Sequence, residues 1–220
     1  MKLPLSNRLL ACCALVAPGD RVADVGCDHG YLGIHLLQSG IAASVIESDV
    51  APGPLDSARR NAAKYGTQDR TSFFLSDGVQ SIPRDFDTLV CAGMGGDTMI
   101  SILSAAPWLC SSRYRLILQC QSKRPELRRY LSDHGFAICR ETLAQDGKFL
   151  YPVMEVRYAP GQALTGAELY ITPALRQSGS PLLPAFLSHV LTGIRKAAAY
   201  NDDQRPLLEA LEEIAREVQP

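Results

Sequence analysis

Short hydrophobic runs alternate with helix-like patterns through the first 158 residues of the chain. Apolar runs rich in β-branched residues predict strands, and apolar residues spaced three or four positions apart predict helices. A glycine directly follows three of the predicted helices, as expected just beyond the end of a helix. The predicted strands lie at residues 22–25, 44–47, 71–75, 87–91, 115–119, 136–143 and 151–158. The predicted helices lie at residues 31–39, about 54–65, 99–104 and 126–134.

The order of these elements predicts the fold class. Strands that are separated by helices predict an α/β fold with a mainly parallel sheet, covered on both faces. The last two strands are separated only by the turn Asp146-Gly147, which predicts an antiparallel pair at the edge of the sheet. We therefore expect a seven-stranded mixed sheet.

The pattern changes after Tyr158, where Ala159-Pro160-Gly161 predicts a boundary between a domain at 1–160 and a helical extension at 161–220. Apolar residues in the extension recur at helical spacing in two segments around a turn at Asn201-Asp202-Asp203, which predicts a helical hairpin. It either packs on the main domain or forms a coiled-coil-like arm for a macromolecule or a second subunit, and we favour the arm. The two apolar stripes are Leu183, Phe186, Leu187, Val190, Leu191 and Ile194, and Leu207, Leu208, Leu211, Ile214 and Val218.

Composition excludes several classes of protein. The chain has 220 residues, 46% of them hydrophobic, yet no apolar run approaches the length of a membrane span. The amino-terminal segment lacks the hydrophobic core of a secretory signal. The seven cysteines include no Cys-x-x-Cys pair and no Cys/His spacing typical of a metal site. We expect a cytoplasmic protein with reduced cysteines, no metal and no membrane contact.

The net charge of −1 is distributed unevenly. Residues 1–112 carry 8 basic and 11 acidic side chains, residues 113–157 carry 9 and 5, and residues 158–220 carry 5 and 7. The middle segment is thus the basic one, with a cluster formed by Lys123, Arg124, Arg128 and Arg129. These cations either contact phosphates or form an ordinary solvated helix face, and the sequence leaves both readings open.

Acidic residues and glycines follow the predicted strands, where ligands bind in parallel sheets. Asp24, Gly26, Asp28 and Gly30 surround the end of the first strand, and the two glycines permit a sharp turn and a close approach to the backbone. Glu47 and Asp49 follow the second strand. Either carboxylate can accept two hydrogen bonds from a ribose diol, and we prefer Asp49 because it starts the loop. Asp77-Gly78 follows the third strand, and in a site that holds a nucleotide cofactor its carboxylate would accept a hydrogen bond from an adenine amino group.

A second glycine-rich turn, Ala92-Gly93-Met94-Gly95-Gly96, follows the fourth strand. Its bare backbone is suited to holding a flat base or a reacting group close to the chain. Alternatively, the glycines only permit a tight connection between a strand and a helix. The chain has no Asp/Asn-Pro-Pro-aromatic tetrapeptide here, which disfavours methylation of an exocyclic adenine amine.

Together these motifs resemble the TrmK family, bacterial tRNA (adenine-N1)-methyltransferases that act on adenine 22. The resemblance runs from about residue 5 to 158, with a helical extension of the kind the family carries. One departure is Cys120-Gln121, where the family pattern has Pro-Asn. The motifs are Leu5-Ser6-x-Arg8-Leu9, Asp24-Val25-Gly26-x-Asp28-His29-x-Tyr31-Leu32, Gly53-Pro54, Asn61, Tyr65-Gly66, Asp77-Gly78, Ala92-Gly93-Met94-Gly95-Gly96, Leu116-Ile117-Leu118-Gln119 and Gly147-Lys148.

The resemblance implies a Rossmann-like methyltransferase sheet, S-adenosylmethionine (SAM) as the cofactor, tRNA as the partner, and a monomer or weak dimer. Asp28 is the candidate catalytic residue: its carboxylate either stabilises positive charge on the methylated base or contacts the amino group of the cofactor. The cofactor-binding residues implied are Asp24, Gly26, Cys27, Asp28, Gly30, Glu47, Asp49, Asp77, Gly78, Ala92, Gly93, Met94 and Gly95. The RNA-binding residues implied are Arg8, His29, Lys123, Arg124, Arg128, Arg129 and Lys148.

Two other functions stay open from the sequence. One is methylation of a small molecule, which would not require the basic cluster. The other is binding of a nucleotide or RNA without catalysis. An NAD-dependent oxidoreductase is disfavoured, because the first loop lacks the Gly-x-Gly-x-x-Gly spacing that holds a pyrophosphate at a helix amino terminus.

Overall fold

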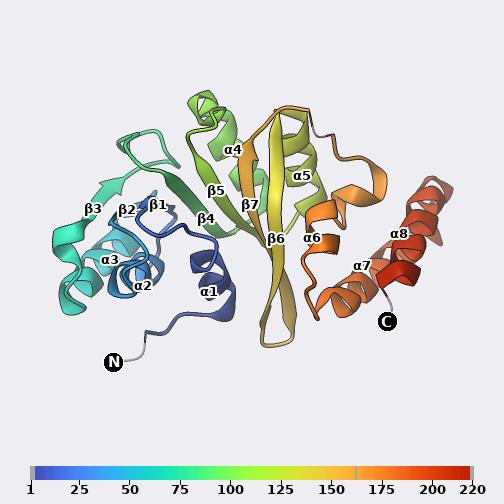
Figure 1. Cartoon of the computed structure of the whole chain (residues 1–220), viewed down its shortest axis with the longest axis horizontal. Helices are drawn as coiled ribbons and strands as arrows, with labels where there is room; N and C mark the ends of the chain where they lie inside the picture. The colour runs from blue at the N-terminus through green and yellow to red at the C-terminus, as the bar shows by residue number, and fades with distance from the viewer. Residues whose placement is uncertain (1–2, 162, 219–220) are drawn as a thin grey trace.

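The alternating pattern folds into one seven-stranded sheet with helices on both faces in the computed structural model, which describes residues 3–161 and 163–218 (Figure 1). The strand order is β3-β2-β1-β4-β5-β7-β6. Strands β1 to β5 pair in parallel, whereas β7 pairs antiparallel with both β5 and β6. This confirms the predicted mixed sheet. The strands are β1 (Arg21–Val25), β2 (Ser44–Asp49), β3 (Thr71–Leu75), β4 (Thr88–Met94), β5 (Arg115–Cys120), β6 (Phe136–Asp146) and β7 (Phe149–Tyr158).

Helices cover both faces of the sheet because its central strands are apolar on both sides. In β4, Leu89 and Cys91 face a core beneath α4 and α5, whereas Val90 faces a second core beneath α1 and α2. Short 3₁₀ helices occur at Gln68–Arg70, Pro107–Leu109, Gly166–Leu169 and Asp202–Gln204. The α-helices are α1 (Asn7–Cys13), α2 (Tyr31–Gln38), α3 (Pro52–Lys64), α4 (Gly96–Ser104), α5 (Arg124–Asp133), α6 (Pro173–Gln177), α7 (Leu183–Ala198) and α8 (Arg205–Val218).

Helix α1 was not predicted from the sequence. It has seven residues, too few for a helical period to be recognised, and its buried side chains are Cys12 and Cys13. These two thiols pack in the core beneath α1 and α2. Helix α1 packs against strands β4 to β7, and its Arg8 reaches Gln119 near the carboxyl end of β5.

The sheet contains a point at which the chain reverses its direction of travel across the strands. From β1 the chain continues outward to β2 and β3, then returns to β4 on the other side of β1. At such a switch point the connections leave β1 and β4 in opposite directions, which opens a crevice at the carboxyl ends of the two strands. The fold therefore places the candidate ligand site between β1 and β4.

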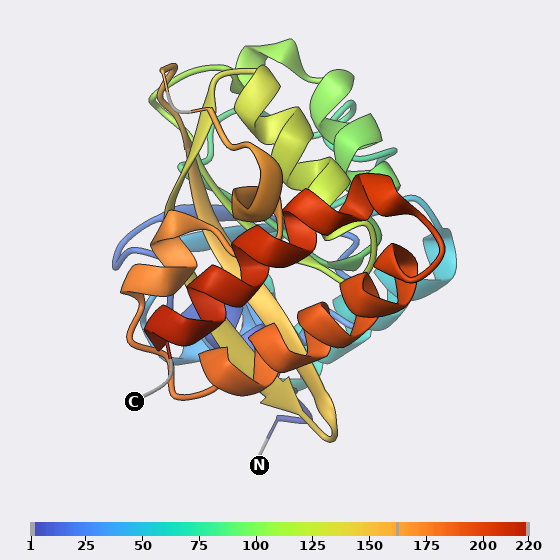
Figure 2. The ribbon, with the colours of Figure 1, turned by 90° about the vertical axis from the view of Figure 1, so that its right-hand side faces the viewer.

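The carboxy-terminal residues contain the predicted helical hairpin. Helices α7 and α8 lie side by side (Figure 2), beyond β6 and at the opposite end of the molecule from β3 (Figure 1). Strand β6 extends three residues past its predicted end, and β7 begins two residues before its predicted start. Leu143, at the predicted end of β6, and Leu150, on the extension of β7, contribute to the core of the hairpin. The hairpin is thus packed on the strand tip. Leu164 and Leu169 follow the predicted domain boundary at residue 160, yet their side chains belong to the core of the sheet. The division into two domains therefore stays a prediction.

Candidate functional site

A cavity of about 90 Å³ lies at the switch point between β1 and β4. It brings together the end of β1, the loop that follows, the first turn of α2, Ala92 of β4 and the first turn of α1. Leu9 and Leu32 were not among the predicted site residues. The residues that line the cavity are Arg8, Leu9, Asp24, Gly26, Cys27, Asp28, His29, Tyr31, Leu32 and Ala92.

The loop between β1 and α2 is held by hydrogen bonds to neighbouring elements. The backbone N–H groups of Gly26 and Cys27 both donate to the carbonyl of Ser48 on β2, at 2.8 and 3.0 Å. Asn61 of α3 donates through Nδ2 to the carbonyl of His29 at 2.9 Å. Gly26 has a φ of 72°, and a Cβ there would lie 2.3 Å from Cε of Met94. The requirement for glycine at this position is therefore conformational, since only the flexible end of the Met94 side chain would have to shift for a Cβ.

Asp28 holds a conformation that side chains other than glycine rarely adopt, with a φ of 51°. Its backbone N–H donates to Oδ2 of Asp49 at 3.3 Å, and Oδ1 of Asp49 accepts from the N–H of Ala51 at 2.9 Å. The Asp28 side chain is 73% exposed, and its Oδ1 lies 3.6 Å from Nε2 of His29. Asp28 therefore presents its carboxylate at the mouth of the cavity.

Asp24 and Glu47 form a buried pair of carboxyl groups on adjacent strands, 4% and 2% exposed. Burial raises the pKa of Asp24 to about 7 and raises the pKa of Glu47 well above its usual range. Oε2 of Glu47 faces no N–H donor among the described residues. Burial of two carboxyl groups at paired strand positions favours the protonated form of the pair. The pair thus keeps a proton at neutral pH.

The two acids of β2 have different surroundings. A Cβ on Gly33 of α2 would lie 2.1 Å from Oε1 of Glu47, so this side chain is enclosed beneath the helix. Asp49 ends β2 and is 9% exposed. Of the two candidates for a ribose diol, Asp49 is the one positioned at the open edge.

Asp77 and Gly78 follow β3 at the same edge of the sheet, although they do not line the cavity. Asp77 is exposed, and Gly78 has a φ of 58° and packs against Ile102 of α4. The acidic groups after β1, β2 and β3 therefore form a row along the carboxyl ends of the strands.

The second glycine-rich turn packs tightly against the loop that follows β5. Gly96 donates its N–H to the carbonyl of Ser122 at 2.9 Å, and a Cβ on Gly96 would lie 2.4 Å from the carbonyl oxygen of Lys123. Gln121 donates its N–H to the carbonyl of Met94 at 2.8 Å. A Cβ on Gly95 would also meet the Ser122 hydroxyl, at 3.0 Å. Close packing between these two loops thus explains why positions 95 and 96 are glycine. Gly93 instead donates its N–H to a side chain of β5.

Gln119 connects this turn to α1. Its Oε1 accepts from the backbone N–H of Gly93 at 3.0 Å and from Nη1 of Arg8 at 2.9 Å. Arg8 also forms an ion pair with Asp146, at 3.8 Å. Gln119 is fully buried. The sequence motif Leu116-Ile117-Leu118-Gln119 contributed to the family resemblance, but Gln119 was not predicted as a site residue, because its two partners are far away in the sequence. Its side chain fixes Gly93 and Arg8 at the rim of the cavity.

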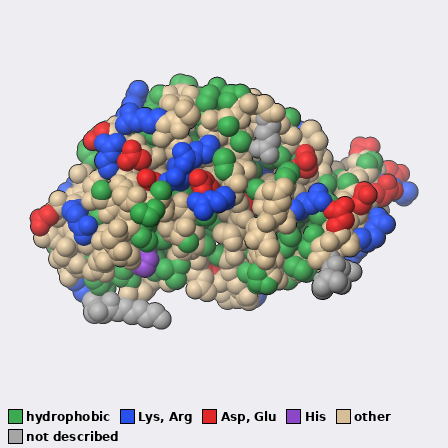
Figure 3. Space-filling view, viewed as in Figure 1, with side chains coloured by type: hydrophobic (Ala, Val, Ile, Leu, Met, Phe, Trp, Pro, Cys, Tyr) green, Lys and Arg blue, Asp and Glu red, His purple; other side chains and the backbone are tan. Residues whose placement is uncertain are grey.

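The basic residues of the middle segment do not form a single exposed cluster. Lys123 pairs with Asp97 at 2.5 Å, and Arg129 is exposed. Arg124 and Lys148 line a second cavity, described below. On the face shown in Figure 3, most cations lie beside carboxylates.

Arg128 is not available to RNA, contrary to the prediction. Its side chain is 1% exposed and forms an ion pair with Glu141 of β6, which is also buried. Nη1 of Arg128 donates to the carbonyls of Leu169 and Tyr170 at 3.0 and 2.6 Å, and Thr172 donates its hydroxyl hydrogen to Glu141. Arg128 instead joins α5 and β6 to the segment that leads into α6.

Within the described ranges, no group of three or more His, Cys, Asp or Glu side chains is arranged to hold a metal ion. No helix in the part of the chain that the structure describes is long and apolar enough to cross a membrane.

Comparisons with known proteins identify the family of the chain. A family model for a methyltransferase domain matches residues 5–154. A putative tRNA methyltransferase of Mycoplasma pneumoniae is 35% identical over 159 residues, covering 69% of this chain and 71% of that protein. The tRNA (adenine(22)-N(1))-methyltransferase of Bacillus subtilis is 32% identical over 149 residues, covering 67% of this chain and 63% of that protein. The match thus spans less than two thirds of the B. subtilis enzyme.

A solved structure extends the similarity to the hairpin. The Streptococcus pneumoniae protein Sp1610, a putative tRNA (m1A22) methyltransferase in complex with S-adenosyl-L-methionine, superimposes with a TM-score of 0.87 at 27% identity. The superposition covers 96% of this chain and 99% of that one. The chain therefore belongs to the methyltransferase domain family, and its resemblance to the TrmK family is confirmed.

Proposed function

We propose that the protein transfers a methyl group from SAM to N1 of adenine 22 in tRNA. The observation that carries the proposal is the cavity between β1 and β4, where a glycine-rich loop presents Asp28 beside Asp24 and Arg8. The named activities of the Bacillus and Streptococcus relatives support the same substrate.

The residues at the switch point fit SAM. The cofactor carries positive charge, and Asp24, Asp28 and Asp49 surround the position where it would lie. Asp49 would accept the ribose hydroxyls, and Asp77 would accept the adenine amino group. A cavity of about 90 Å³ is smaller than typical ligand sites of about 300–1,000 Å³. The adenosine portion would therefore lie along the open edge past Asp49 towards Asp77.

When bound, SAM supplies an electrophilic methyl group on a positively charged sulfur. N1 of adenine has an in-plane lone pair, so this chain's task is to hold N1 in line with that methyl group. Methylation leaves positive charge on the base, and the exposed Asp28 carboxylate would stabilise that charge or accept a proton from the amino group. The alternative role of Asp28, a contact to the cofactor's amino group, places the same carboxylate at the same mouth.

The tRNA has to expose the target base, because N1 is a Watson–Crick atom. His29, 3.6 Å from Asp28, is placed to orient the base at the mouth. Arg124, Arg129 and Lys148 supply positive charge for the phosphate backbone. Arg8 and Lys123 contribute less, since Asp146 and Asp97 already pair with them. From the proposed tRNA substrate we infer that the activity is cytoplasmic.

The proposal is tested by digesting tRNA to nucleosides after incubation with the protein and SAM, and measuring 1-methyladenosine by mass spectrometry. We expect it to form on an unmodified transcript with adenine at position 22 and to be absent when guanine replaces that adenine. Asp28→Asn keeps the shape of the side chain and removes its charge. This variant should bind SAM and methylate much more slowly if the carboxylate stabilises the charged base, whereas full activity would remove Asp28 from the mechanism.

A further inference from the structure

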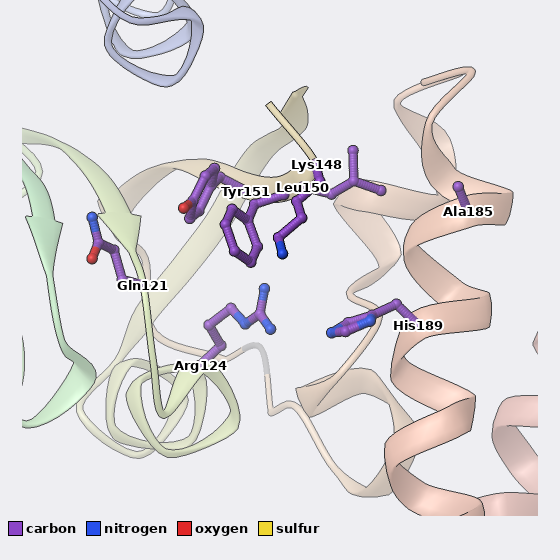
Figure 4. Close-up of a pocket in the computed structure, with 8 residues that line it drawn as sticks. Gln121, Arg124, Lys148, Leu150, Tyr151, Ala185 and His189 are labelled. Carbon is purple, nitrogen blue, oxygen red and sulfur yellow. The ribbon is translucent and has the colours of Figure 1, made fainter. Parts of the chain in front are cut away.

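A second cavity, of about 400 Å³, lies between the end of β5, the tip of the β6–β7 hairpin and α7 (Figure 4). The main domain contributes Gln121 and Arg124, the strand tip contributes Lys148 and Tyr151, and the carboxy-terminal hairpin contributes His189. This cavity is larger than the one between β1 and β4 and is within the range of about 300–1,000 Å³ typical of ligand sites. The remaining lining residues are Phe149, Leu150 and Ala185.

The cavity is positively charged and lacks a compensating acid. None of its lining residues is an Asp or Glu, and neither Arg124 nor Lys148 forms an ion pair within the described ranges. By contrast, Arg8, Arg128 and Arg195 are each paired with a carboxylate. Figure 4 shows Arg124 and Lys148 pointing towards one another across the space, with the ring of His189 directed into it from α7.

Arg124 is a half-buried guanidinium that stacks on the Phe186 ring, with its carbon 5.3 Å from the ring centroid. Burial lowers the pKa of Arg124, and the nearby Arg128 lowers it further. A buried cation without an anionic partner costs free energy, which an anion bound in the cavity would offset. Phosphate suits an arginine fork with a lysine beside it.

Aromatic surface lies next to these cations. The Phe149 side chain is 56% exposed at the strand tip, and Nζ of Lys148 lies 5.4 Å from the centre of its ring. Tyr151 is tilted against Phe149, with the ring centroids 6.2 Å apart. Proteins that bind single-stranded nucleic acid combine cations for the backbone with exposed aromatic rings on which bases stack.

The second cavity adjoins the site at the switch point. Gln121 lines the second cavity, and its backbone N–H bonds the carbonyl of Met94 at 2.8 Å. A Cβ on Gly93 would lie 3.7 Å from Nε2 of Gln121, and Gly93 follows Ala92, which lines the first cavity. The two cavities are therefore separated only by the end of β4 and the loop after β5, which the hydrogen bond between Gln121 and Met94 joins.

We propose that the second cavity binds the phosphate and base of a tRNA nucleotide next to the target adenosine. Arg124 and Lys148 hold the phosphate, Phe149 and Tyr151 stack the base, and His189 closes the cavity from the carboxy-terminal hairpin. The inference rests on the proposed function and adds to it a specific substrate contact. It also gives the hairpin a role in holding the macromolecular substrate.

The test measures binding of a tRNA transcript at several salt concentrations by fluorescence anisotropy. Lys148→Ala should reduce the slope of log K against log salt concentration by about 0.7 to 0.9, because one phosphate contact is lost. Phe149→Ala should weaken binding by about 5- to 150-fold, the loss of one stacked base. Arg113→Ala is the matched control. Arg113 precedes the amino end of β5, whereas the cavity lies at the carboxyl end of this strand, and its guanidinium lies 5.2 Å from the centre of the Tyr114 ring.

A second measurement tests which nucleotide is held. Ethylation of the phosphates adjacent to adenosine 22 should interfere with binding of the wild type and should add little to the defect of Lys148→Ala. Interference confined to distant phosphates would overturn the assignment, as would normal tRNA binding by both Lys148→Ala and Phe149→Ala.

Calorimetric titration with SAM keeps the two proposals separable. Both cavity variants should bind SAM as the wild type does, because Lys148 and Phe149 are exposed and do not line the first cavity. If the wild type methylates adenine 22 and the variants bind tRNA normally, the cavity assignment fails alone. If the wild type methylates no tRNA, the proposed function fails as well.

Discussion

Replacing Arg128 with methionine separates the structural account of this residue from an RNA-binding role. Methionine keeps much of the side-chain length but leaves the Glu141 carboxylate buried without its cation, and it removes the donors to the carbonyls of Leu169 and Tyr170. Loss of one partner from a buried ion pair costs about 3–5 kcal/mol. For a chain of this size, that corresponds to a fall in Tm of about 6–20 °C.

Urea unfolding followed by circular dichroism measures this loss, with Arg129→Met as the matched control. Arg129 is the exposed neighbour, so its replacement should change the free energy of unfolding by no more than about 0.5 kcal/mol. The double variant Arg128→Met, Glu141→Leu should recover much of the loss, because it removes the stranded charge. Unchanged stability of Arg128→Met together with weakened tRNA binding would refute the structural role.

Three further predictions concern the site at the switch point. Gly26→Ala should lower the free energy of unfolding by at least about 1–2 kcal/mol, the cost of a left-handed backbone at a residue with a Cβ, and urea unfolding measures this loss. Asp49→Ala should raise the Kd for SAM by about tenfold or more in a calorimetric titration, and an unchanged Kd would remove Asp49 from the ribose site. In the folded protein the Asp24–Glu47 pair keeps a proton, whereas the unfolded chain loses it above the usual Asp pKa of 3.8. The contribution of this pair to the free energy of unfolding is therefore fully present below pH 3.8 and is lost as the pH rises towards about 7. This fall amounts to about 1.4 kcal/mol per pH unit for one proton, and Glu47→Gln should flatten it in urea unfolding measured across this pH range.

The sheet was predictable because each central strand is apolar on both faces and most of the helices between strands end at glycine. The same logic placed Asp24, Asp28 and Asp49 at one edge, since the carboxyl ends of parallel strands lie together. Helix α1 was missed because a helix of seven residues shows no clear period. Arg8 was predicted as a site residue, but its bond to Gln119 depends on that helix.

The basic cluster shows where a sequence pattern stops being informative. The four cations of the cluster lie within seven positions of one another, yet each has a different environment in the fold; they are Lys123, Arg124, Arg128 and Arg129. Arg128 is neutralised by Glu141, which lies 13 positions away and carries no sign of the pairing in its local sequence. Arg124 keeps an unpaired charge because the strand tip and α7 surround it without supplying an acid. Long-range packing, rather than local composition, decides which cation can meet a phosphate.

The central claim is tested most directly by locating the methyl group on the tRNA. A 1-methyladenosine blocks Watson–Crick pairing, so primer extension by reverse transcriptase should stop beside position 22 after the transcript is incubated with the protein and SAM. The account predicts that this stop appears with SAM, is absent without it, and disappears when adenine 22 is replaced. Methylation at another position, or tRNA binding without any stop, would contradict the account.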